Sequence, residues 1–163
     1  MKRGEKAIFI IIAAVVVGLM GRNIWHIETS KEVDKGIPFY STATSEIASQ
    51  AMDVYRKNDC KNCHTLWTVR NLIESVPAPM LDGLGSLHSE DWFYQYFSAN
   101  NPQSIIPSRL KQEYKMPSYA MLPDDDRRLL AKYMASLKVK DWYLDEVKKG
   151  EFEKLTGKEY RHD

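Results

Sequence analysis

Residues 60–64 read Cys60-Lys61-Asn62-Cys63-His64, and they are the most informative residues of the chain. C-x-x-C-H is the signature of covalent haem c attachment. In that chemistry each of the two thiols forms a thioether to one vinyl group of a single porphyrin. The adjacent His64 then lies under the iron as the proximal ligand. The stretch therefore predicts one covalently bound haem c.

The same two residues, Cys60 and Cys63, are the only cysteines in the chain. A structural disulfide, a zinc site and a thioredoxin-like redox pair are the alternative uses for them. Zinc normally needs four ligands, and a redox pair is expected beside a β-α-β pattern, which the sequence does not contain. Because His64 directly follows the second cysteine, haem attachment is the favoured interpretation.

The N-terminus has the pattern of an export signal that is retained as a membrane anchor. Lys2, Arg3 and Lys6 precede an unbroken apolar run over residues 7–21, and no A-x-A-like cleavage site follows the run. As a helix this run would be ~22 Å long, against a hydrocarbon core of ~30 Å. Apolar residues as far as Ile27 make up the difference.

We therefore expect residues 1–27 to form a single transmembrane helix in a bacterial inner membrane, with its basic end inside and the rest of the chain on the periplasmic side. Arg22 and His26 lie within the extended span, so packing against other membrane subunits would suit this helix better than lipid alone. The net charge of the chain is only +1, which argues against a nucleic-acid partner.

Three helices are expected outside the anchor. The first should start near Thr44 and lead to Cys60, the second should follow Ser89, and the last should open at Pro123 with acidic residues in its first turn. Each has apolar residues at helical spacing on one face. These faces are Ile47, Ala51, Val54 and Tyr55; Trp92, Phe93, Tyr96 and Phe97; and Leu129, Leu130, Tyr133, Met134 and Leu137.

The segments between these helices are expected to be irregular. Residues 28–43 form a polar tether that is interrupted by Gly36-Ile37-Pro38. Residues 65–78 are irregular or partly helical, and a long loop spans residues 103–120.

Four features now follow one another: a helix running into C-x-x-C-H, a Pro-x-Leu-x-Gly segment at residues 79–83, Met116-Pro117 in a late loop, and a closing amphipathic helix. This order resembles a class I cytochrome c over residues 44–138. The resemblance implies an all-α haem domain. It also implies that the carbonyl of Pro79 accepts a hydrogen bond from His64, which orients the ring, and that Met116 is the distal iron ligand.

Some shorter stretches narrow the resemblance. Residues 89–92, 101–104 and 116–119 look like the membrane-anchored monohaem subunits of haem-copper oxidases, and one anchor followed by one haem domain is similar to the small subunit of bacterial nitric oxide reductases. The resemblance implies an electron-transfer subunit or tethered carrier of a respiratory membrane complex, not an enzyme by itself. Its partners would be the other subunits, a redox donor, a redox acceptor and the lipid bilayer.

The distal ligand can also be argued from the residues, because the chain has seven methionines. Five of them lie in the anchor region, on helices or beside the proximal turn, which leaves Met116 and Met121 in the late loop. Pro117 restricts the backbone of Met116 to extended conformations, which suits a thioether held over iron. Met116 is therefore favoured, with Met121 and His88 as alternatives.

With two axial ligands the iron would carry out outer-sphere electron transfer only. The alternative is a haem-based sensor or peroxidase, which needs an open sixth position. Arg109, in the late loop, is a candidate for binding a haem propionate, because a guanidinium suits a carboxylate. The alternative for Arg109 is a solvated loop residue.

Residues 139–163 are expected to be a docking extension. About 25 residues are too few for a core of their own. Apolar and aromatic residues nevertheless occur among the charges, as on surfaces that bind a partner. The alternative is that Trp142 and Tyr143 fold back onto the haem domain.

Overall fold

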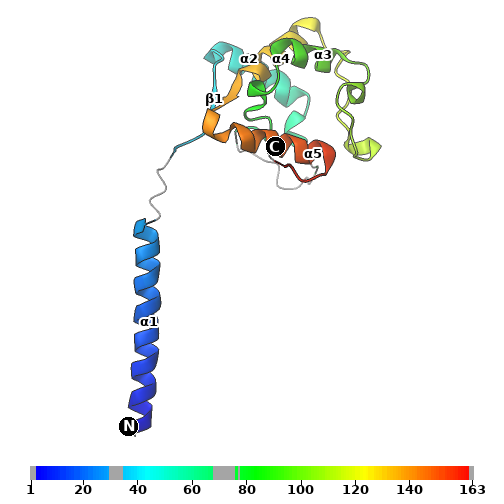
Figure 1. Cartoon of the computed structure of the whole chain (residues 1–163). Coiled ribbons are helices and arrows are strands. Elements are labelled where there is room, and N and C mark those ends of the chain that lie inside the picture. Colours follow the sequence, from blue (N-terminus) through cyan, green and yellow to red (C-terminus); the bar gives the residue numbers. More distant parts are fainter. Residues whose placement is uncertain (1–2, 30–34, 68–75, 77, 162–163) are drawn as a thin grey trace. The chain divides into compact units, whose positions relative to one another are not determined.

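The computed structural model describes residues 3–29, 35–67, 76 and 78–161 and divides the chain into two compact units, Met1–Gly36 and Ile37–Asp163. The first unit contains helix α1 (Arg3–Thr29), which is drawn in blue in Figure 1. Its described apolar side chains are exposed, from Phe9 at 64% to Trp25 at 73%. Among the described residues, no helix has the length and apolarity needed to cross a membrane.

The second unit consists mostly of helices. They are α2 (Ser45–Lys57), α3 (Glu90–Ser98), α4 (Asp124–Ser136) and α5 (Leu144–Thr156). Two short strands, β1 (Phe39–Ser41) and β2 (Leu137–Val139), pair antiparallel with Phe39 opposite Val139. Short 3₁₀ turns lie at Cys60–Asn62, Leu84–Ser86, Pro102–Ser104, Gln112–Tyr114 and Asp141–Tyr143.

The three helices expected from the sequence are confirmed, and their caps explain where they begin. The Thr44 hydroxyl accepts a hydrogen bond from the backbone N–H of Ile47 at the start of α2, and the Ser89 hydroxyl accepts one from Trp92 at the start of α3. Both are side-chain caps for backbone donors that a helix start leaves unpaired. The third helix, α4, has Pro123 at its N-cap and three acidic residues in its first turn.

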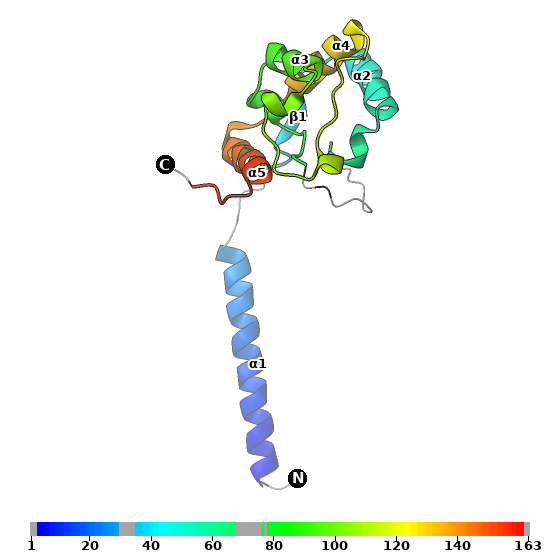
Figure 2. The same cartoon turned by 90° about the vertical axis from the view of Figure 1, so that its right-hand side faces the viewer.

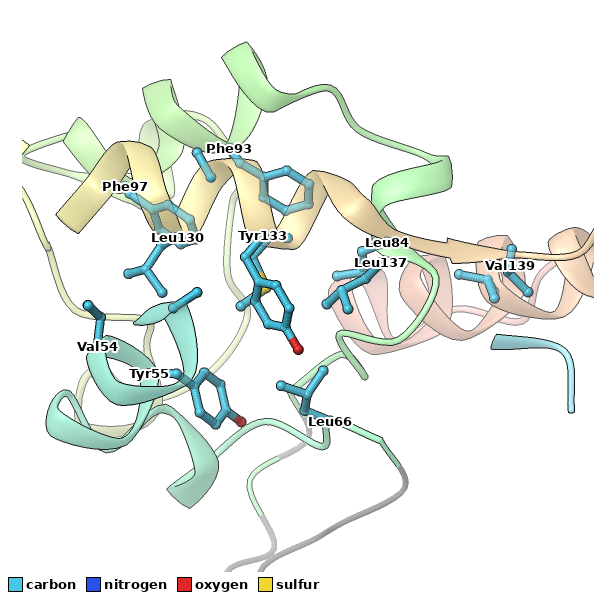
Figure 3. Close-up of a cluster of buried hydrophobic side chains, with 14 residues drawn as sticks. Val54, Tyr55, Leu66, Leu84, Phe93, Phe97, Leu130, Tyr133, Leu137 and Val139 are labelled. Atoms are coloured by element: carbon cyan, nitrogen blue, oxygen red, sulfur yellow. The ribbon is translucent and has the colours of Figure 1, made fainter. Parts of the chain in front are cut away.

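The core forms where α2, α3 and α4 meet (Figure 3). Tyr133 of α4 is 2% exposed and lies between side chains of the neighbouring helices, and Ala51 of α2 is fully buried. Side chains of the aromatic face expected on α3 stack on one another, with ring centroids 5.3 Å apart for Trp92 and Tyr96. Burial of these faces accounts for the stability of helices too short to form alone.

The β1–β2 pair corrects the expectation of a purely all-α fold. Its first strand lies in residues 28–43, which were expected to be a tether, so the C-terminal part of that segment belongs to the domain. The Ser41 and Ser136 hydroxyls are 2.9 Å apart and strengthen the pairing. Three-residue strands joined over nearly 100 residues leave no alternating pattern in the sequence, because each is too short to show one.

Residues 139–161 are packed on the domain in this structure. Val139 is 4% exposed in β2 and Val147 is 5% exposed on α5, and both belong to the core. Tyr143 packs edge-on against Phe39, with ring centroids 5.4 Å apart. The expectation that this segment stays apart from the haem fold is therefore wrong, and the fold-back alternative describes its packing. Figure 2 shows α5, drawn in red, against the lower edge of the domain.

Candidate haem site

The C-x-x-C-H stretch folds as a tight turn directly after α2. Asp59 adopts the left-handed conformation with φ of 54°, which ends the helix and starts the 3₁₀ turn at Cys60–Asn62. The backbone N–H groups of Cys63 and His64 both donate to the Cys60 carbonyl, at 3.2 and 2.9 Å. This winding brings Cys60, Cys63 and His64 to one cavity, which all three line.

That cavity is lined mainly by apolar and aromatic side chains. α3 contributes Trp92, Phe93, Tyr96 and Phe97, and α4 contributes Leu130 and Met134. Burial raises the pKa of Tyr96 to about 12, so its hydroxyl stays neutral near the cavity at physiological pH. A planar, largely apolar macrocycle suits such a lining, because ligand sites are concave and mostly hydrophobic with a few placed polar groups.

His64 is oriented by a backbone carbonyl. Its Nδ1 lies 2.9 Å from the carbonyl oxygen of Pro79, and since a carbonyl can only accept, Nδ1 carries the proton and donates. Desolvation lowers the pKa of His64, although the Pro79 hydrogen bond opposes this shift. The ring is therefore neutral, and the lone pair of its other nitrogen, Nε2, is available to a metal.

That lone pair faces Met116. Nε2 of His64 lies 3.5 Å from the Met116 sulfur. Neither atom carries a proton in this tautomer, so the contact is between two potential metal ligands and is not a hydrogen bond. His64 and Met116 would therefore be the two side chains that hold a haem iron, one through nitrogen and one through sulfur.

The loop that carries Met116 is held by two polar contacts. The side-chain amide of Gln103 donates to the Met116 carbonyl at 2.9 Å, and the Ser118 hydroxyl donates to the Ala99 carbonyl at 2.8 Å. The alternative ligand Met121 is 94% exposed. Geometry thus brings Met116, and not Met121, to His64.

The two cysteines differ in environment. Partial burial raises the pKa of the Cys60 thiol to about 11, opposed by a hydrogen bond with Tyr119, whereas Cys63 is exposed. The two are not joined in a disulfide. Within the described ranges, no three His, Cys, Asp or Glu side chains come together as a group that could hold a metal ion. Two separate thiols beside a neutral histidine in an apolar cavity fit a covalently attached haem.

The other predicted residues are placed as follows. Arg109 lines the rim of the same cavity and packs against Gly157, where a Cβ would lie 2.8 Å from its Nε. His88, the other alternative ligand, lines the cavity but lies 2.7 Å from a carboxylate oxygen of Glu151. Of the segment expected to be irregular after His64, residues 68–75 and 77 lie outside the described residues.

Three contributors were not foreseen from the sequence. The Tyr55 hydroxyl donates to the His64 carbonyl at 3.3 Å, and Gln103 holds the backbone of Met116. Glu151 of α5 lines the cavity. Tyr55 could have been found, because it lies on the buried face of the helix that leads to the motif. The other two act across the tertiary fold, and no local spacing marks them.

Comparison with known families agrees with this geometry. The family model described as Cytochrome c matches residues 48–138, which is more than half of the chain. The chain belongs to the cytochrome c family. The cytochrome c domain therefore carries covalently bound haem c, one group in the class I pattern, and the chain is an electron-transfer haem protein. Searches of curated proteins and of solved structures found no match.

In a cytochrome c the bound haem supplies one-electron redox chemistry. The residues of this domain supply the attachment, orientation and surroundings of that group. Cys60 and Cys63 would hold the group covalently, the Pro79 carbonyl sets the tautomer and orientation of His64, and the aromatic residues of α3 give the cavity an apolar lining. Orientation of a ligating histidine by a carbonyl also raises its basicity.

Proposed function

We propose that this cytochrome c is a membrane-anchored carrier that passes single electrons as a subunit, or a tethered partner, of a respiratory membrane complex. The observation that carries the proposal is the 3.5 Å approach of His64 Nε2 and the Met116 sulfur across the haem cavity. One ligand from each side of the iron leaves no position for a substrate. Outer-sphere electron transfer is the chemistry that such a centre can perform.

The same contact weighs against the alternative of a sensor or peroxidase, since both need an open sixth position. Thioether ligation also favours the ferrous state and raises the reduction potential, as suits a carrier near the oxidising end of a chain. The hydrogen bond from Gln103 to the Met116 carbonyl supports a loop that is built to hold this ligand.

The membrane part of the proposal rests on α1. The described apolar side chains of this helix, including Phe9, Val17 and Ile24, are exposed without a polar face between them. Apolar side chains exposed along most of a helix favour its burial in lipid or against other proteins. We place the haem domain on the periplasmic side, with other membrane subunits and separate redox donor and acceptor proteins as partners.

The ligand set is tested on the haem-loaded full-length chain by substituting each loop methionine in turn. Met116→Ala should abolish the sulfur-to-iron charge-transfer band of the ferric protein and lower the reduction potential by on the order of 100 mV or more, within the range that axial ligands control. Met121→Ala is the matched control, since its side chain is 94% exposed, and should leave both unchanged.

If Met121→Ala abolished the band and lowered the potential while Met116→Ala changed neither, Met121 would be the ligand. A wild-type protein without the band, with high-spin iron that binds small ligands readily, would favour the sensor or peroxidase alternative. Membership of a respiratory complex is tested separately by mild detergent extraction of native membranes. The chain should then copurify with membrane-embedded redox subunits, and its migration alone under these conditions would contradict a subunit role.

A further inference from the structure

The C-terminal helix α5 reaches the haem cavity, although the family match ends at residue 138. Glu151, Lys154 and Leu155 of this helix line the cavity together with the C-x-x-C-H residues. We propose that α5 is a wall of the haem site, in which Leu155 excludes water and Glu151 is a positioning residue that holds the wall through His88. The inference uses only the haem that family membership establishes, and does not depend on which residue is the distal ligand.

α5 is attached first to the proximal side of the site. Val147 is 5% exposed and its methyl groups pack on Gly83, where an added Cβ would come within 3.1 Å of Val147 Cγ2. Gly83 has a φ of +83° and ends the segment whose Pro79 carbonyl orients His64. A residue with a side chain would be both strained and crowded at this position. The helix therefore packs directly on the segment that holds the proximal ligand.

The second attachment is the pair of His88 and Glu151. Nε2 of His88 lies 2.7 Å from a carboxylate oxygen of Glu151, and the two side chains are only 21% and 16% exposed. The His88 ring also stacks on Trp92 of α3, with centroids 3.9 Å apart. Because a shielded hydrogen bond to a charged group is worth more than an exposed one, this contact can fix the position of α5 against α3.

The third attachment is on the side of the distal loop. Arg109, which lies in the same loop as Met116, packs against Gly157 at the C-terminal end of α5. The last carbonyl groups of a helix carry partial negative charge, so a guanidinium is favoured there. α5 thus touches the proximal segment, the start of α3 and the distal loop, which are three parts of one cavity.

This arrangement predicts an effect on the reduction potential. The ferric centre carries one more positive charge than the ferrous centre, and water stabilises the more charged form. An apolar side chain at the cavity edge therefore favours the ferrous form. Replacing Leu155 by a smaller residue admits water and should lower the potential, whereas a volume-conserving residue should not.

The test measures the reduction potential of the haem-loaded full-length chain in detergent. In Leu155→Ala the equilibrium constant for reduction should fall by roughly threefold, which is ~28 mV for one electron at 59 mV per tenfold change. Leu155→Met should keep the wild-type potential. Glu146→Ala is the matched control, because Glu146 is an exposed residue of the same helix that does not line the cavity.

Comparing two neutral replacements of Glu151 separates the effect of its hydrogen bond with His88 from the effect of its negative charge on the reduction potential. Glu151→Gln keeps an acceptor for His88 and Glu151→Ala does not, so the Ala variant should have the lower potential. Equal potentials in these two would overturn the positioning role of Glu151. A wild-type reduction potential in Leu155→Ala, or an equal shift of the potential in Glu146→Ala, would contradict the proposal that α5 is a wall of the haem site. The charge-transfer band of the wild-type protein reports on the Met116 proposal independently of these results.

Discussion

Gly85 shows how strongly one residue can constrain the approach of two elements. A Cβ at this position would clash with the backbone carbonyl of Ala135 at the end of α4, and would lie 2.6 Å from the Met134 carbonyl. Backbone atoms of a packed helix cannot move aside as a flexible side chain can. Gly150, on α5, offers a contrast, because nothing lies within 4 Å of its added Cβ.

These two glycines give opposite predictions for the same substitution. Gly85→Ala should lower the free energy of unfolding by about 1–3 kcal/mol, the usual cost of overpacking. Gly150→Ala should raise it by roughly 0.4–1 kcal/mol, because alanine restricts the unfolded chain and favours the helix. Urea titration of the haem-loaded protein, followed by circular dichroism, measures both. A stable Gly85→Ala variant would mean that α4 and the 3₁₀ turn at Leu84–Ser86 are not packed this closely.

At the scale of elements, α5 is the helix of the haem domain that the sequence did not predict, although it packs against the core. Its residues alternate between charged and apolar types, a pattern that also suits a partner-binding segment. Val147 decides between these uses in this structure, since it is 5% exposed and belongs to the core. A role in docking to other subunits is still a prediction, and it would concern the outward side of α5, including the 37% exposed Phe152.

Val147→Ala tests whether α5 belongs to the cooperative fold. Loss of two buried methyl groups at about 0.8 kcal/mol each should lower the free energy of unfolding by roughly 1.5 kcal/mol or more. Lys148→Ala is the control, because Lys148 is a 44% exposed residue whose ammonium group lies 3.1 Å from the carboxylate of its neighbour Asp145. Thermal unfolding of the haem-loaded chain measures the difference. Equal melting temperatures would restore the interpretation of residues 139–163 as a separate extension.

At the scale of the whole molecule, the haem domain has its own hydrophobic core. Every residue of its hydrophobic core lies between Ala51 and Val147, and the first unit ends at Gly36. Because these described core residues all lie in the second unit, we predict that this unit folds without residues 1–36. The β1–β2 pair limits how much of the N-terminus can be removed, because loss of Phe39 would expose Val139 and the edge of Tyr143.

Replacing residues 1–36 with a cleavable export signal should therefore release a soluble haem protein into the periplasm. Its haem should stay attached in denaturing electrophoresis with haem staining, and its reduction potential should match that of the full-length chain. A second form that starts after residue 43, and so lacks β1, is the matched comparison and should be less stable. An insoluble or haem-free product from the first form would show that α1 or its partners are needed for folding.

The haem chemistry and most of the helices of this protein could be predicted from short stretches of its sequence. C-x-x-C-H is a local motif, and its residue spacing alone indicates haem attachment. The caps at Thr44 and Ser89 act within one helical turn. The motif and both caps can therefore be recognised without knowledge of the tertiary structure. The geometry of Met116 agrees with the ligand that Pro117 and the family resemblance favoured, because the loop leaves few candidates.

How the ends of the domain close around the site could not be predicted from the sequence, because it depends on tertiary packing. The β1–β2 pair joins residues nearly 100 positions apart, and His88 meets Glu151 across 63 positions. Such contacts have no periodicity of their own, because they depend on the packing of several elements at once. The sequence placed residues 139–163 outside the domain for this reason, whereas burial of Val147 and the approach of α5 to the cavity place residues 139–161 within it.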